Sequence, residues 1–182
     1  MCGLSGIINF KGYEKDFYLD IINGFNNDLQ HRGPDNSDIW KDKNNFCYFG
    51  HTRLSIIDLQ DRSNQPMVDE DNEYVLIFNG EIYNYLDLRE KLINHGIKFR
   101  TTSDTEVLLK GFKYFGKSFI QHIDGMYAFA IFDIKRKKLL LCRDRAGEKP
   151  LYYISRPNFF VFCSELKPLL RLSKKINFDI SE

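Results

Sequence analysis

Four short apolar runs in the second half of the chain constrain its fold more than any other feature. They are nearly uninterrupted, polar turns join them, and they cover Met126–Phe132, Leu139–Cys142, Leu151–Ile154 and Phe159–Cys163. Tight connections predict hairpins and therefore antiparallel strands, yet a sheet with one face in water would alternate apolar and polar residues. Both faces should be covered, which favours an α+β fold with two stacked antiparallel sheets between helical layers.

The first half of the chain supplies the expected helices. Apolar residues at helical spacing predict one helix from Lys15 to the breakers Gly33 and Pro34. A second is expected from Ile82 to Gly96, and a third opens at Ser103, where Ser103 and Glu106 match a capping box. Further strands are predicted over Leu4–Phe10, Ile39–Trp40, Phe46–Phe49 and Tyr74–Phe78, the last stopping at the turn pair Asn79-Gly80.

Composition narrows the possible partners. The 182 residues fit a single domain, and 26 Lys and Arg against 25 Asp and Glu leave a net charge of +1. No global field would attract nucleic acid or a membrane surface, and no apolar run approaches the ~20 residues of a membrane span. We therefore expect a cytoplasmic protein that binds neither nucleic acid nor a membrane.

The cysteines carry no metal-binding pattern. Cys47, Cys142 and Cys163 lie in or beside apolar runs, and no C-x-x-C pair or neighbouring histidine has the spacing of a zinc site. We expect these three to pack as small apolar side chains and expect no metal site.

Cys2 is different because of its position. Removal of Met1 would place a thiol and a free α-amine on one residue, so that a nucleophile and its base are joined. An α-amine titrates near ~7.7–8.0 and can accept a thiol proton at neutral pH. The alternative is an ordinary small residue at a frayed chain end.

Several motifs in one order resemble the class II glutamine amidotransferase domain, and more narrowly the N-terminal glutaminase half of glutamine-hydrolysing asparagine synthetases. The resemblance spans nearly the whole chain, so residues 1–182 are expected to form one such domain. The fold it implies is the αββα sandwich of the N-terminal-nucleophile hydrolases, in agreement with the apolar runs. The motifs are Cys2-Gly3, His31–Asp35, Gly50–Ile56, Gln65–Met67, Phe78–Asn84, Ser103–Glu106, Arg143–Tyr153 and Ser164–Lys167.

The resemblance implies hydrolysis of the glutamine side-chain amide to glutamate and ammonia. Cys2 would be the nucleophile, and Asn79 and Gly80 would bind the oxyanion. Arg53 matches the residue that binds the substrate α-carboxylate, a task suited to a guanidinium. Glu81 and Asp104 match positions near the α-ammonium group, although an acid in a first helical turn is also favoured by the helix dipole.

Other polar residues in these motifs are interpreted as structural. His31 and His51 could suggest a Cys/His dyad, but the terminal amine already supplies a base, and histidines in turns commonly hold loops by hydrogen bonding. Asp144 and Lys149 lie in a charged loop whose role the sequence leaves open.

The ATP-binding loop of complete asparagine synthetases is missing from the 182 residues. ATP and magnesium are therefore expected only in a C-terminal synthetase domain or subunit that would receive the ammonia, and this chain should need no cofactor. Two alternatives remain: a non-catalytic glutamine-binding or regulatory module, and the glutaminase half of an amidotransferase with another acceptor.

Overall fold

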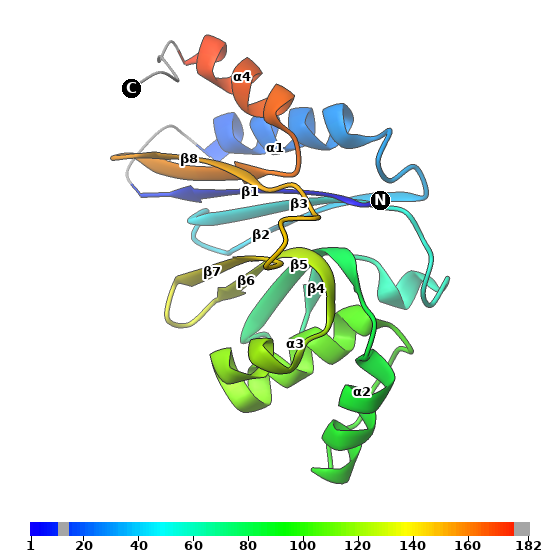
Figure 1. Cartoon of the computed structure of the whole chain (residues 1–182). Helices are drawn as coiled ribbons and strands as arrows, with labels where there is room; N and C mark the ends of the chain where they lie inside the picture. Colours follow the sequence, from blue (N-terminus) through cyan, green and yellow to red (C-terminus); the bar gives the residue numbers. More distant parts are fainter. Residues whose placement is uncertain (11–14, 177–182) are drawn as a thin grey trace. The chain divides into compact units, whose positions relative to one another are not determined.

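The computed structural model describes residues 1–10 and 15–176, which divide into two compact units (Figure 1). The first unit contains Met1–Leu54 and the chain from Pro150 onward, and the second contains Ser55–Lys149. Each unit combines an antiparallel sheet with helices, so the fold class is α+β, as expected.

The first unit is built on a five-stranded sheet with its N-terminal strand at the centre. The strand order is β2-β3-β1-β9-β8, and every pair is antiparallel. The strands are β1 (Gly3–Asn9), β2 (Asn36–Lys41), β3 (Cys47–Arg53), β8 (Tyr152–Arg156) and β9 (Phe159–Cys163). The first strand thus pairs with one strand from each end of the sequence.

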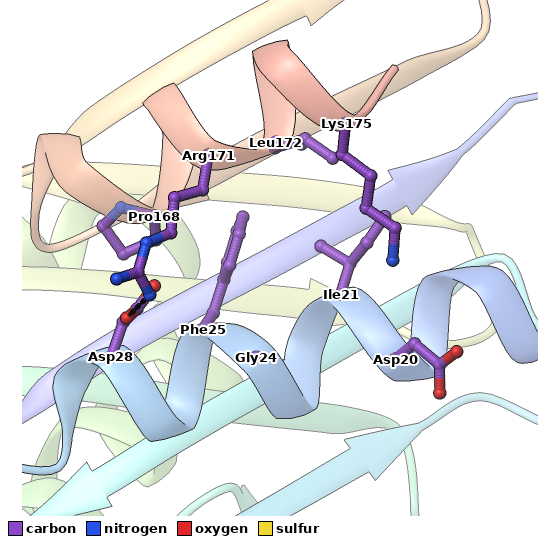
Figure 2. Close-up of a pocket in the computed structure, with 9 residues that line it drawn as sticks. All are labelled: Asp20, Ile21, Gly24, Phe25, Asp28, Pro168, Arg171, Leu172 and Lys175. Carbon is purple, nitrogen blue, oxygen red and sulfur yellow. Dashed lines mark hydrogen bonds and ion pairs between the residues drawn. The ribbon is translucent and has the colours of Figure 1, made fainter.

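Two helices, α1 (Lys15–Leu29) and α4 (Leu166–Lys175), pack beside each other against this sheet (Figure 1). Their apolar side chains bury a core that includes Ile22, Leu29, Tyr48, Val161 and Leu169. A groove of about 150 Å³ lies between the two helices, where Arg171 of α4 forms an ion pair with Asp28 of α1 (Figure 2). No helix is predicted from the sequence over Leu166–Lys175, although the buried leucines of this segment alternate with basic residues as in an amphipathic helix.

The second unit has a four-stranded sheet in the order β4-β5-β6-β7, again antiparallel. Its strands are β4 (Met67–Val68), β5 (Tyr74–Ile82), β6 (Gly125–Asp133) and β7 (Lys138–Arg143). Helices α2 (Tyr85–Asn94) and α3 (Asp104–Phe115) share one core with this sheet, including Phe78, Leu92, Leu108 and Phe129. Two 3₁₀ segments, Asp61–Ser63 and Gly116–His122, complete the unit.

Strand β5 is longer than the sequence predicted. The sequence predicts a turn at Asn79-Gly80, but the strand continues to Ile82, and Asn79 and Gly80 pair with Ala128 and Tyr127 of β6. The turn interpretation was therefore wrong: pairing along the whole of β6 overrides the local preference of the Asn-Gly pair.

None of the helices in the described part of the chain is long and apolar enough to span a membrane.

Candidate functional site

The thiol of Cys2 lies at the end of strand β3. Cys2 is half-buried just before β1, and the backbone N–H of Leu54 points to its Sγ at 3.4 Å. The Leu54 carbonyl oxygen lies 3.7 Å from the same sulfur and can accept the thiol proton. A thiol with a backbone N–H beside it is suited to carrying negative charge, because that donor stabilises the thiolate.

Close packing at Gly3 fixes the backbone that carries Cys2. Gly3 pairs with Thr52 of β3, and an added Cβ would lie 2.5 Å from Thr52 Oγ1 and 2.8 Å from Leu29 Cβ. No larger residue fits without moving β1, so the Cys2-Gly3 pair has a structural reason as well as a chemical one.

Arg32 holds Cys2 from the other side, a role that the sequence did not reveal. Its Nε donates to the Cys2 carbonyl oxygen at 3.0 Å, and its Nη1 donates to Glu165 Oε1 at 3.2 Å. His31 Nε2 contacts the same Glu165 oxygen at 2.8 Å, in keeping with the loop-holding role expected of it. The His31–Asp35 motif was the available signal, but it did not indicate which residue Arg32 contacts.

Arg53 is the last residue of β3 and is buried. Its carbonyl oxygen accepts the N–H of Asp35 at 3.0 Å, which ties the end of the strand to the loop that contains Gly33. A Cβ at Gly33 would lie 2.3 Å from the Thr52 backbone, so this loop packs directly on the strand end. A buried guanidinium is suited to binding a carboxylate, the role predicted for Arg53.

Asn79 and Gly80 lie in the second unit on strand β5. Asn79 is only 1% exposed, and its Nδ2 has no hydrogen-bond partner among the described residues. An unused buried donor is uncommon and calls for an explanation, of which a ligand oxygen is one. A Cβ at Gly80 would lie 2.3 Å from Met126 O, so glycine is required here by close approach to β6.

Asp104 is a buried carboxyl at the start of helix α3. Its Oδ2 accepts the N–H of Ile82 at 3.1 Å. Burial is the main cause that raises its pKa to about 6; backbone N–H groups oppose this shift, and the nearby Glu81 carboxylate adds to it. Burial and a like charge disfavour the charged form of this carboxyl, so a positive group beside it would be favourable because it would stabilise that form.

The capping box expected at this helix is half formed. The Glu106 N–H donates to Ser103 Oγ at 3.2 Å, as predicted. The Glu106 carboxylate accepts instead from the N–H groups of Thr101 at 2.7 Å and Arg100 at 2.9 Å. The helix start that carries Asp104 is therefore tied to the preceding loop.

The six predicted site residues fall into two groups. Cys2 and Arg53 belong to the first unit, where both are next to Leu54 in space or in sequence. Asn79, Gly80, Glu81 and Asp104 belong to the second, where the Ile82–Asp104 hydrogen bond joins the end of β5 to α3.

Asp144 closes the loop that precedes Lys149. Its carboxylate accepts the N–H groups of Tyr127 at 3.2 Å, Glu148 at 2.8 Å and Lys149 at 3.0 Å. Burial alone would raise the pKa of Asp144, but these N–H donors hold it below its usual value. Its observed contacts are structural.

One group of carboxylates in the described ranges is close enough to hold a cation: Asp69, Asp71 and Glu73. Lys113 already lies among them, with its Nζ 2.5 Å from Asp69 and 3.3 Å from Glu73. A lysine ammonium there supplies the positive charge that a metal would otherwise bring.

Comparison with known proteins gives a consistent result. The model of the glutamine amidotransferase domain family matches residues 1–182. A Methanocaldococcus jannaschii protein named as a glutamine-hydrolysing asparagine synthetase is 42% identical over 97% of this chain and 36% of its own length. Asparagine synthetase [glutamine-hydrolyzing] 3 of Bacillus subtilis is 38% identical over 93% of this chain and 27% of its own. The chain thus spans about a third of these relatives or less.

A solved structure, the glutamine phosphoribosylpyrophosphate amidotransferase of B. subtilis, superimposes with a TM-score of 0.74 at 24% identity. The match covers 92% of this chain and 43% of that one. At this identity the likeness concerns the fold alone, and it agrees with the predicted α+β fold of antiparallel sheets and helices.

Proposed function

Because this chain belongs to the glutamine amidotransferase domain family, we propose that it hydrolyses the side-chain amide of glutamine to glutamate and ammonia. The observation that carries the proposal is the buried Asn79 side-chain amide on β5, whose Nδ2 has no hydrogen-bond partner among the described residues, in a chain whose Cys2 thiol has a backbone N–H beside it. Acyl transfer requires such groups: a sulfur nucleophile and donors for an oxyanion.

The proposed reaction has two halves. The Cys2 thiolate attacks the amide carbon, forming a C–S bond and a tetrahedral oxyanion that Asn79 and Gly80 stabilise. The Cys2 α-amine, free once Met1 is removed, takes the thiol proton and delivers it to the leaving nitrogen, so the C–N bond breaks and ammonia departs. Water then attacks the thioester, which releases glutamate and restores the thiol.

The remaining residues bind the two ends of the amino acid. The Arg53 guanidinium takes the α-carboxylate, for which a planar donor with two parallel N–H groups is well matched. Asp104, with Glu81 next to its partner Ile82, takes the α-ammonium group. That group would favour the charged form of Asp104, whose pKa is about 6 without it.

The ammonia acceptor is the next part of the proposal. Relatives named as asparagine synthetases are about three times as long as this chain. We therefore propose that the ammonia serves asparagine synthesis from aspartate in a synthetase domain or subunit, which would bind ATP and magnesium. A cytoplasmic location suits this role, since the four cysteines are free thiols.

The test is glutamate release from glutamine by the purified chain, with the removal of Met1 confirmed by intact mass. Cys2→Ala should abolish release. Cys142→Ala is the matched control, because Cys142 is also a half-buried free thiol but lies on β7. Equal glutamate release by Cys2→Ala would refute the proposal, and glutamine binding without release would indicate a non-catalytic module.

A further inference from the structure

On one edge of strand β5, the second half of the strand has no neighbouring strand among the described residues. The two residues of β4 pair with Val75 and Leu76, and in the part of the chain that the structure describes no strand pairs with β5 on that side beyond Leu76. The backbone groups of alternate residues in an antiparallel ladder point to opposite sides. The N–H groups directed to this edge come from the even-numbered residues, as the bonds from Tyr74, Phe78 and Ile82 to side chains show.

Gly80 belongs to this even-numbered set. Its partner across the ladder is Tyr127, whose N–H and carbonyl both bond to Asp144 on the far side of β6. Gly80 and Tyr127 are therefore a pair that exchanges no hydrogen bonds, and the Gly80 N–H points to the open edge. We find no acceptor for it among the described residues, while the N–H groups two residues before and after it are both bonded to side chains.

The two side chains that flank Gly80 come from different parts of the unit. Gln65 Oε1 accepts the Phe78 N–H at 2.6 Å, and Asp104 Oδ2 accepts the Ile82 N–H at 3.1 Å. Gln65 also reaches helix α3, since its Nε2 donates to Thr105 Oγ1 at 3.4 Å. Gln65 is 4% exposed, so its amide joins the strand to the start of the helix in a setting from which water is largely excluded.

We propose that Gln65 is a positioning residue that holds the Gly80 N–H in place as an oxyanion donor. The inference rests on the proposed function and extends it to a residue outside the predicted site. Gln65 supplies the acceptor for the Phe78 N–H that a longer β4 would have supplied. A longer β4 would also have covered the Gly80 N–H, whereas the Gln65 side chain leaves it uncovered. The Gly80 N–H thus stays available while the backbone on both sides of it is fixed.

Without Gln65 the buried Phe78 N–H loses this side-chain acceptor, which loosens the strand next to Asn79. Oxyanion donors act through their distance to a charge that exists only in the transition state, so a small displacement lowers kcat and leaves substrate affinity nearly unchanged.

The test compares Gln65→Met with Gln65→Glu. Methionine has similar length but cannot accept from Phe78 strongly, and we expect kcat for glutamine hydrolysis to fall about 10- to 100-fold, with KM within about threefold of the wild type. Glutamate keeps the acceptor oxygen and should restore kcat to within about fivefold of the wild type. Wild-type kcat in Gln65→Met would overturn the proposal.

Asp69→Ala is the matched control. Asp69 Oδ1 accepts the Tyr74 N–H at 2.8 Å at the opposite end of the same strand, so this variant also removes a side-chain acceptor from the β5 edge. It should lower stability but leave kcat unchanged. An equal loss of kcat in Asp69→Ala would overturn the proposal, because it would show that any loosening of β5 has the same effect.

A second readout, which needs no turnover, tests this inference separately from the proposed function. It also shows whether each variant is folded. The amide resonance and hydrogen exchange of Gly80 can be followed by NMR in the Cys2→Ala background, where no turnover occurs. Gln65→Met should shift the Gly80 resonance and speed exchange at Phe78, and Asp69→Ala should leave both unchanged. Unchanged signals in Gln65→Met would overturn the positioning role, whereas an inactive wild type with shifted signals would refute only the glutaminase proposal.

Discussion

The backbone N–H of Ile82 donates to the carboxylate of Asp104 at 3.1 Å, which joins the last residue of strand β5 to the first residue of helix α3. The bond partly compensates the burial of this carboxyl, but not fully, since its pKa remains raised to about 6. Asp104 therefore changes its charge over about one pH unit on either side of that value, with effects on both ligand affinity and stability.

We predict that glutamine affinity falls in acid because of Asp104. At pH 5 a carboxyl with a pKa of about 6 is roughly 90% neutral, so affinity for an α-ammonium group should be about tenfold weaker than at pH 8. Asp104→Asn should bind more weakly at pH 8, by about 2 kcal/mol or more, and lose this pH dependence. Calorimetric titration of Cys2→Ala with glutamine at both pH values measures the effect, and an unchanged pH profile in Asp104→Asn would contradict it.

The same carboxyl should lower stability near neutral pH. Its pKa is about 6 in the folded chain against 3.8 as the ordinary value, so the folded state binds the proton more tightly. The resulting stability is present below pH ~4 and is lost as the pH rises through about 6, roughly 3 kcal/mol at most. Asp104→Asn keeps an acceptor for Ile82 and should therefore be more stable than the wild type above pH 6, with the difference shrinking toward pH 4. Urea unfolding at several pH values tests this, and a constant difference would count against it.

Two helical glycines should respond oppositely to alanine. A Cβ at Gly24 in α1 meets nothing within 4 Å, and Gly24 faces the groove of Figure 2, so Gly24→Ala should stabilise by about 0.5–1 kcal/mol. A Cβ at Gly111 in α3 would lie 2.1 Å from the ring of Phe119, so Gly111→Ala should destabilise by about 1–3 kcal/mol. Thermal unfolding of the two variants measures both changes. Equal shifts in Tm would show that packing around the added Cβ does not determine the change in stability.

We predict that Arg32 supports turnover because it holds the backbone of Cys2. Arg32→Lys removes the Nε–H that donates to the Cys2 carbonyl, and we expect kcat to fall about tenfold as the thiol loses its fixed position. His31→Ala is the control, since the ring of His31 contacts Glu165 whereas Arg32 contacts both Glu165 and Cys2. Matching losses in the two variants would mean that Glu165, and not the Cys2 contact, is responsible. Glutamate release under saturating glutamine is the measurement.

Much of the fold could be predicted because the apolar runs are strong local signals. Runs such as Met126–Phe132 and Phe159–Cys163 became strands β6 and β9, and the helical spacing after Lys15 became α1. The short strand β4 and helix α4 were missed. Strand β4 has only two residues, and α4 is a short helix that packs on helix α1, far away in the sequence, and on the neighbouring strands β8 and β9.

For the site, the sequence yields candidate residues but not their contacts. Motif order pointed to Cys2, Arg53 and Asp104, whereas the contacts of Arg32 and Gln65 depend on segments far apart in the sequence. Arg32 contacts Cys2 across 30 positions and Gln65 contacts Thr105 across 40. No local pattern encodes such pairs, because they arise from strand register and loop packing. The roles assigned to the six predicted residues stay predictions that the variants above address.

The central place of β1 in its sheet has a consequence for biosynthesis. The strand that follows Cys2 pairs with Cys47–Arg53 on one side and with Phe159–Cys163 on the other, and Leu4 also bonds to Ser164, 160 positions away. During synthesis, β1 cannot pair with β9, its second neighbour, until more than 160 residues have been made. During that interval Cys2 lies beside a half-paired strand, so the sheet around this amino terminus is completed only when Phe159–Cys163 has been made.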